Sequence, residues 1–146
     1  MLSKDLLQQF EDNITRFDEN IHAFENGEID RQTFKGISGG FGSYAQKEQG
    51  YMLRLRLPGG HITKEKLKFL ADKISEHQIS LLKLPPCQTI QFHDLSVDSV
   101  PQLIRDALKV GIITHGGGGD NPRNVMASPL TGTAPDETFD VFPYAQ

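Results

Sequence analysis

The stretch YMLRLRL, residues 51–57, alternates two kinds of side chain along its length. Successive side chains of a β-strand point to opposite faces of the sheet, so every second residue shares a face. One face carries Tyr51, Leu53, Leu55 and Leu57, and the other carries Met52, Arg54 and Arg56. Pro58-Gly59-Gly60 follows and ends the strand. The pattern predicts a strand that buries one face and presents two arginines on the other.

The residues after this strand show helical and strand patterns in turn. The predicted elements are a helix over 63–77, strands over 79–84 and 88–95, a helix over 98–110 and a short strand over 112–114. The order of strand, helix, strand, strand, helix, strand is that of the split βαβ, or ferredoxin-like, sandwich. The predicted fold class is therefore α+β, with an antiparallel sheet and both helices on one of its faces.

Further segments flank this unit on both sides. Apolar residues from Ser3 to Asn26 recur at alternating spacings of four and three, which predicts an N-terminal helical arm. We favour packing of this helix on its own domain over docking on a partner. Residues 36–50 contain five glycines and are expected to form a flexible loop. The predicted division is an N-terminal helix and Gly-rich loop over 1–45, the ferredoxin-like unit over 46–115 and an irregular C-terminal extension over 116–146.

The composition limits the compartment and the partners. The chain has 146 residues, 37% of them hydrophobic, and a formal net charge of −4. Nucleic acids and anionic membranes select basic surfaces, so neither is expected as a partner. No apolar run approaches the roughly 20 residues that span a bilayer, and the N-terminus is too polar for a secretory signal, so we expect a cytoplasmic protein. The single cysteine, Cys87, cannot ligate an iron–sulfur cluster by itself.

The polar face of the predicted sheet is the first candidate site. In the ferredoxin-like topology the first and third strands are neighbours, which places Arg54 and Arg56 beside Thr89, Gln91 and His93. Such a surface suits a flat ligand with several negative charges. Two alternatives remain open: the arginines form ion pairs with carboxylates of other elements, or His93 has a structural role.

The second candidate is the segment GGGGDNPRNV, residues 116–125. A phosphate-binding P-loop needs Lys-Ser or Lys-Thr after its last glycine, and Asp120-Asn121 stands there instead. Arg123, framed by Asn121 and Asn124, could bind an oxyanion through two parallel hydrogen bonds, or it could be a solvated turn residue. The histidines show no metal-ligand spacing, so no metal site is expected.

Three segments in succession resemble landmarks of the nitrite and sulfite reductases that use sirohaem and a four-iron cluster. They are GYMLRLRLPGGHIT at 50–63, KLPPCQTIQFHDL at 83–95 and GDNPRNVMASPLTG at 119–132. The resemblance covers about residues 40–132 and implies a ferredoxin-like half-domain over 46–115. It also implies that 116–146 begin the domain that holds sirohaem and the 4Fe-4S cluster.

The resemblance implies roles for individual residues. Arg54 and Arg123 match the catalytic arginines that bind the sulfite or nitrite oxyanion. The positions that match contacts to the carboxylates of sirohaem are Arg56, Lys83, Thr89, Gln91, His93, Asn121 and Asn124. Cys87 departs from the family, which commonly has arginine there, so this position is not expected to supply the carboxylate contact that the arginine makes. Lys83 replaces an arginine and keeps the charge without the bidentate geometry.

The function implied is that of an N-terminal fragment of a reductase that converts sulfite to sulfide, or nitrite to ammonia, with sulfite favoured. The expected cofactors of the full-length parent are sirohaem and a 4Fe-4S cluster, whose cysteine ligands this chain lacks. The expected partners are sulfite or nitrite, the remaining C-terminal part of the polypeptide, and an electron donor such as ferredoxin or a flavoprotein. The fragment alone is predicted to be inactive. The alternative is a non-catalytic ferredoxin-like module that binds a tetrapyrrole, another anion or a protein.

Overall fold

The computed structural model describes residues 3–47 and 50–145. Its helices are α1 (Lys4–Glu25), α2 (Arg31–Gly40), the 3-10 turn η1 (Pro58–Gly60), α3 (Lys64–Glu76), α4 (Ser99–Lys109) and α5 (Phe142–Ala145). Its strands are β1 (Ser43–Ala45), β2 (Tyr51–Arg56), β3 (Leu82–Lys83) and β4 (Thr89–Leu95). The described residues contain no helix long and apolar enough to cross a membrane.

The strands form one antiparallel sheet in the order β1-β2-β4-β3. The predicted pairing of the two central strands is confirmed, because Arg54 lies opposite Gln91 and Arg56 lies opposite Thr89. The apolar face of the alternating stretch is buried, with Leu53 and Leu55 fully enclosed. The α+β ferredoxin-like fold class is therefore confirmed.

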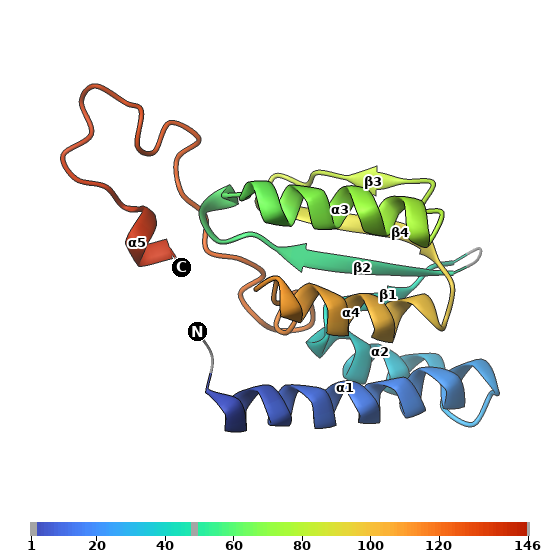
Figure 1. The fold of residues 1–146 in the computed structure, drawn as a ribbon. Coiled ribbons are helices and arrows are strands. Elements are labelled where there is room, and N and C mark those ends of the chain that lie inside the picture. The colour runs from blue at the N-terminus through green and yellow to red at the C-terminus, as the bar shows by residue number, and fades with distance from the viewer. Residues whose placement is uncertain (1–2, 48–49, 146) are drawn as a thin grey trace.

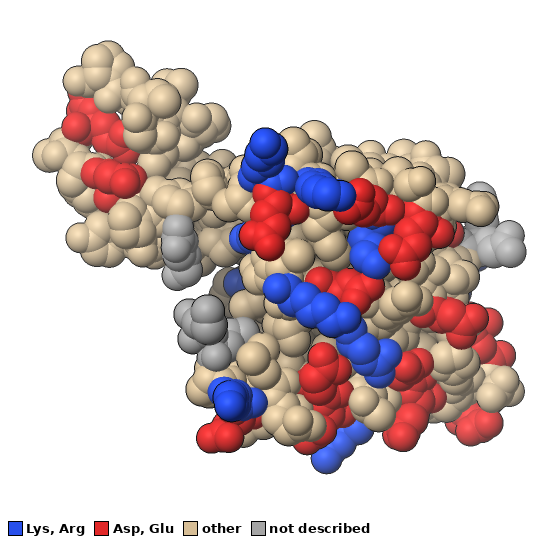
Figure 2. Space-filling view, viewed as in Figure 1, with Lys and Arg blue, Asp and Glu red and all other residues tan. Residues whose placement is uncertain are grey.

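Helices α3 and α4 cover the same face of the sheet (Figure 1). Thr63 caps α3 by accepting a hydrogen bond from Lys66 N, and α4 buries Val100, Leu103 and Ala107. Lys73 of α3 contacts Asp106 of α4 at 2.6 Å, and basic and acidic residues are interspersed on this side of the molecule (Figure 2). The face opposite the helices is left to the polar side chains of β2 and β4.

The predicted strand over 112–114 was wrong, because these residues form no strand in the structure. Part of the β2 edge that they would need is taken by β1, whose Ser43 and Ala45 pair with Leu53 and Tyr51. Ile113 instead accepts one backbone hydrogen bond, from Arg56 N at 3.3 Å. This single hydrogen bond joins residues 112–114 to the edge of β2, but it is not enough to form a strand.

The predicted loop over 36–50 was also wrong for much of its length. Residues 36–40 belong to α2 and residues 43–45 form β1, whereas residues 48–49 lie outside the described part. The Asp30 side chain caps α2 by accepting from Gln32 N and Thr33 N, and Phe34 buries its side chain in the core. A cap and a buried aromatic anchor therefore offset the low helix propensity of the glycines.

The N-terminal helix packs on its own domain, as favoured from the sequence. Ser3 caps α1, and Ile14, Phe17 and Ile21 are buried in the common core. The C-terminal segment is mostly irregular and leads away from the sheet before the short helix α5 (Figure 1).

Candidate functional site

The two arginines of β2 lie on the sheet face that the helices leave uncovered, and both are half-buried. Arg54 Nη1 donates to the carbonyl of Gly117 at 2.6 Å, and Arg56 Nη1 donates to the carbonyl of His115 at 2.7 Å. Neither guanidinium forms an ion pair with a carboxylate of residues 3–47 or 50–145. Arg56 Nε is buried without a hydrogen-bond partner in the same part of the chain. Both positive charges are thus left for an anion to balance.

Polar side chains of β4 continue this arrangement. The Gln91 amide oxygen, in the orientation that satisfies its surroundings, accepts from Arg54 Nη2 at 2.7 Å, and the Gln91 amide nitrogen lies 3.2 Å from His93 Nε2. The other ring nitrogen of His93 lies 3.3 Å from Gln46 Nε2. Burial, and secondly the charge of Lys83, lower the pKa of His93. His93 is therefore protonated less readily than a free imidazole, and it forms part of a polar chain that ends at Arg54.

The glycines of 116–119, which we call the glycine loop, pass directly against α2 and β1. Gly116 N donates to the Gly40 carbonyl at 2.9 Å, and Gly119 N donates to the Tyr44 hydroxyl at 2.5 Å. A Cβ at Gly117 would lie 2.7 Å from the Thr114 carbonyl oxygen. Close packing of backbone on backbone, within the chain itself, therefore explains why this segment is glycine-rich.

The residues that follow the glycine loop line a cavity of about 520 Å³. Its walls include Asn121, Arg123, Asn124 and Cys87, and the Arg123 side chain is exposed. Asn124 Nδ2 donates to the carbonyls of Leu57, Cys87 and Gln88 at 2.8–3.0 Å, so this amide fastens the segment to the β3–β4 connection and the end of β2. Among the described residues that line the cavity, Arg123 is cationic and Asp120 is acidic, and Asn124 holds their segment in place.

The predicted site residues form two neighbouring groups. Arg54, Gln91 and His93 are joined by hydrogen bonds on the sheet, whereas Asn121, Arg123 and Asn124 line the 520 Å³ cavity. Arg54 is not among the described residues that line this cavity, and Arg56 lines a separate one of about 500 Å³ with His61 and Lys66. Lys83 is exposed on β3 opposite Gln91, and Thr89 is buried with its hydroxyl 3.3 Å from Cys87 Sγ. The glycine loop connects the two groups.

Two contacts of this region could not be found from sequence motifs. Tyr44 and Gln46 both come from the segment expected to be a loop, and they contact residues 75 and 48 positions away respectively. Their signal in the sequence is weak, since a tyrosine and a glutamine beside glycines are typical of many loops. No cluster of three or more His, Cys, Asp or Glu side chains that could hold a metal occurs within the described ranges.

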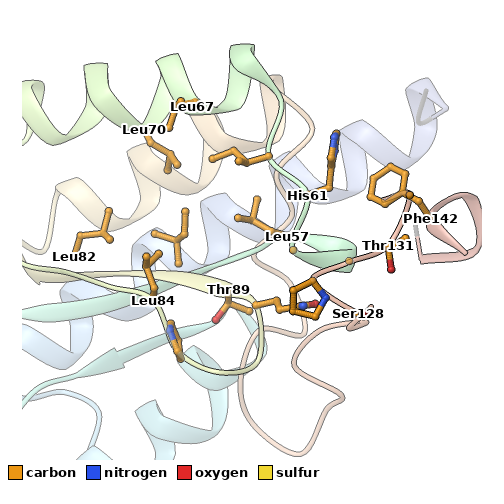
Figure 3. Close-up of a pocket in the computed structure, with 18 of the residues that line it drawn as sticks. Leu57, His61, Leu67, Leu70, Leu82, Leu84, Thr89, Ser128, Thr131 and Phe142 are labelled. Atoms are coloured by element: carbon orange, nitrogen blue, oxygen red, sulfur yellow. The ribbon is translucent and has the colours of Figure 1, made fainter. Parts of the chain in front are cut away.

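A cavity of about 960 Å³ lies elsewhere, between α3, β3 and the C-terminal segment (Figure 3). Apolar side chains, several of them leucines, form much of its wall (Figure 3), and Leu67 on α3 and Leu84 after β3 are both strongly exposed. Among the predicted site residues, Thr89 contributes to this lining, and the arginines do not. An apolar wall does not suit a small oxyanion, so the candidate site remains at the arginines.

His115 lies between the glycine loop and the aromatic core. Its ring contacts Phe10 and Phe41 edge-on, with centroids 5.1 and 4.5 Å away. Burial lowers the pKa of this imidazole below its ordinary value. Its backbone carbonyl holds Arg56, so the packing of His115 and the position of Arg56 are coupled.

We expect the stability of the chain to fall as the pH drops from 7 to 5, and His115 to account for part of the loss. A histidine with a lowered pKa in the folded state takes up its proton more readily when unfolded, so its stabilising contribution is complete above about pH 6.5 and is lost as the pH falls through the folded-state value. Urea unfolding at both pH values measures this loss, and His115→Phe should reduce it.

The pKa of His93 is also lowered, whereas that of His22 is raised, so other histidines contribute to the pH dependence of the wild type. The informative quantity is therefore the difference between wild type and His115→Phe in the stability lost from pH 7 to pH 5. An unchanged pH dependence in His115→Phe would show that the buried imidazole makes no contribution.

The four-stranded antiparallel sheet, with helices on one face and cationic side chains on the other, defines a ferredoxin-like α+β unit. Residues 44–110 match the model of the nitrite/sulfite reductase ferredoxin-like half domain. The resemblance inferred from three short segments is thereby confirmed.

Individual relatives agree with this assignment. The chain is 31% identical over 141 residues to a "Sulfite reductase [ferredoxin]" of Mycobacterium tuberculosis, in an alignment that covers 84% of this chain and 25% of the relative. It is 32% identical over 95 residues to the chloroplastic "Ferredoxin--nitrite reductase" of Spinacia oleracea, covering 64% of this chain and 16% of the relative. The structure of the Mycobacterium tuberculosis NirA protein superposes with a TM-score of 0.72 at 27% identity, over 86% of this chain and 28% of that one. The chain thus spans about a quarter of the length of these mycobacterial relatives.

Proposed function

We propose that this chain is the sirohaem-facing half-domain of a cytoplasmic reductase that acts on sulfite or nitrite, with sulfite favoured. The observation that carries the proposal is the pair of half-buried guanidinium groups, Arg54 and Arg56, without a carboxylate partner in the described chain. Burying such charges is costly unless an anion balances them. A reductase cofactor with several carboxylates, acting on an oxyanion, supplies that balance.

The donor set of the sheet face fits the carboxylates of sirohaem. Arg56 has a buried Nε still free to donate, Lys83 adds an exposed charge at the sheet edge, and Gln91 and His93 add neutral polar groups. Asn124 contributes indirectly, because its amide hydrogens are already donated to main-chain carbonyls. Asn121 and Thr89 are further candidates for carboxylate contacts.

Arg54 and Arg123 would bind the oxygens of the substrate. When bound, sirohaem and the 4Fe-4S cluster of the parent enzyme supply a metal that holds the oxyanion and a route for electrons. A preorganised guanidinium stabilises negative charge that builds up on the substrate oxygens, and it needs no reorganisation at the moment of reaction. Arg54 is preorganised by Gly117 and Gln91, whereas Arg123 is free to approach the anion from the loop.

The remaining parts of the proposal concern the whole enzyme. Residues 116–146 would begin the domain that completes the sirohaem seat, and the cluster ligands would come from outside this chain. Relatives named for ferredoxin suggest ferredoxin as the electron donor. The isolated chain is expected to bind the cofactor without catalysing the reduction.

Sirohaem titration into the purified chain, followed by visible absorption, tests the cofactor seat. Sulfite reduction by a longer reductase that carries this half-domain separates the proposed enzyme from a non-catalytic module that binds a tetrapyrrole. We expect saturable binding at one equivalent, with sulfite reduction by reduced viologen absent from this chain alone. Absence of sirohaem binding by the folded chain would contradict the assigned half-domain role. Binding of a protein or of an unrelated anion in its place would favour a non-catalytic module.

Cys87→Arg is expected to raise the affinity for sirohaem by about tenfold, which corresponds to one additional charge-assisted hydrogen bond. Cys87 lines the cavity beside Arg123, so the new guanidinium would face the same anion-binding region. The matched control is Cys87→Ser, which keeps the size of the side chain and adds no charge. Equal dissociation constants for the arginine and serine variants would place this position outside the sirohaem contact.

A further inference from the structure

The half-buried Tyr44 of β1 lies against glycines from two different segments. Its hydroxyl oxygen accepts a hydrogen bond from Gly119 N at 2.5 Å. A Cβ placed on Gly118 would lie 2.4 Å from this hydroxyl, and one placed on Gly39 of α2 would lie 3.2 Å from it. The tyrosine therefore fills the space between α2 and the glycine loop, and its hydroxyl fixes the loop at its last glycine.

The glycine loop connects the two arginines assigned to the substrate. The carbonyl of Gly117 accepts from Arg54 Nη1 at 2.6 Å, and Arg123 stands four residues after Gly119 in the same segment. A shift of the loop away from Tyr44 would thus move the acceptor that orients Arg54 and the main chain that carries Arg123. The bond to Tyr44 acts at the last glycine of the loop, beside the bond from Gly116 N to the Gly40 carbonyl at its first glycine.

The anchor of Tyr44 itself is firm. Tyr44 lies opposite Met52 in the β1–β2 ladder. Two residues before Tyr44, the Gly42 carbonyl accepts a hydrogen bond from Arg54 N at 2.9 Å. The backbone that carries the tyrosine is therefore bonded to the strand that carries Arg54. The hydroxyl of Tyr44 accepts a hydrogen bond from the glycine loop, which contains no strand or helix, and so ties the loop to this strand.

We infer that Tyr44 is a positioning residue, which sets the placement of Arg54 relative to Arg123 through the bond from Gly119 N to its hydroxyl. This inference rests on the proposed function for the meaning of the two arginines. Tyr44 does not line the 520 Å³ cavity within the described chain, so it acts through the loop and not by touching the anion.

Tyr44→Phe removes this hydroxyl and leaves the ring in place. Net contributions of single hydrogen bonds predict about three- to tenfold faster amide exchange at Gly119, and a loss of sirohaem affinity in the same range. Amide exchange and the Arg54 Nε resonance are measured by NMR on the chain without ligand, and affinity by sirohaem titration. Tyr144→Phe is the control, since Tyr144 is 80% exposed.

The two kinds of measurement separate the two claims. A wild-type chain that fails to bind sirohaem would contradict the proposed function, while the ligand-free exchange data would still judge the placement of the loop. Unchanged Gly119 exchange and an unchanged Arg54 Nε resonance in Tyr44→Phe would overturn the inference. Loss of the fold in this variant would also overturn it, because the role of Tyr44 would then be structural.

Discussion

Gly117→Ala is expected to reduce the free energy of unfolding by about 3 kcal/mol, at the upper end of the range for overpacking. The new Cβ would lie 2.7 Å from the Thr114 carbonyl oxygen, 3.3 Å from Gly42 Cα and 3.4 Å from the Arg54 carbonyl oxygen. All three neighbours are backbone atoms, which cannot rotate away as a flexible side chain can. Urea unfolding followed by circular dichroism measures the loss.

A glycine of α2 provides the control for this substitution. A Cβ at Gly36 would meet no heavy atom within 4 Å, and the residue lies inside the helix. Alanine there should stabilise the chain by about 0.5–1 kcal/mol, because it has the higher helix propensity. Similar unfolding midpoints for Gly36→Ala and Gly117→Ala would show that the glycine loop is not packed as the structure has it.

The two central strands could be predicted because the residue pattern that specifies them lies within short, continuous stretches of sequence. Alternation in residues 51–57 specifies the two faces of β2, and the element order specifies that β4 is its neighbour. The register between Arg54 and Gln91 then follows from the pairing of two short strands with buried leucines. The pairing that places Arg54 beside Gln91 and Arg56 beside Thr89 was therefore predictable from the sequence.

The edge of the sheet could not be predicted in the same way. A segment with several glycines is typical of a loop, and nothing local distinguishes a glycine that frees the backbone from one that allows close packing. Gly39 belongs to the second kind, since a Cβ there would lie 3.1 Å from Gly119 N. Such a contact joins residues 80 positions apart and exists only in the folded chain.

The placement of Arg123 is a similar case. The segment 119–124 predicts an anion-facing arginine, but its distance from Arg54 depends on Tyr44 and on the three carbonyls that hold Asn124. These partners come from α2–β1, from the end of β2 and from the β3–β4 connection. The chemistry of the residue could be inferred from sequence, whereas its position depends on tertiary contacts.

Arg123→Ala is expected to lower kcat/KM for sulfite by about 10–10²-fold in a reductase that carries this half-domain, as for the loss of a charge-assisted hydrogen bond to the oxyanion. A suitable enzyme is a chimera in which this chain takes the place of the aligned segment of the mycobacterial sulfite reductase. The alignment covers 84% of this chain, so most of its residues have a counterpart there. Reduced viologen supplies the electrons, so that the donor protein does not enter the measurement. Arg123→Lys should fall between wild type and alanine, because it keeps the charge and loses the bidentate geometry.

Arg123 is a sharper test than Arg54, because Arg54 also holds Gly117 and Gln91 and its removal would disturb the loop. The Arg123 side chain is exposed, so alanine there should leave the unfolding midpoint and the sirohaem content unchanged. Arg16→Ala, at an exposed position of α1, controls for the loss of one positive charge. If sirohaem content fell in parallel with activity, Arg123 would belong to the cofactor seat. If neither changed, the anion would be bound by the arginines of the sheet alone, and the loop would serve to orient them.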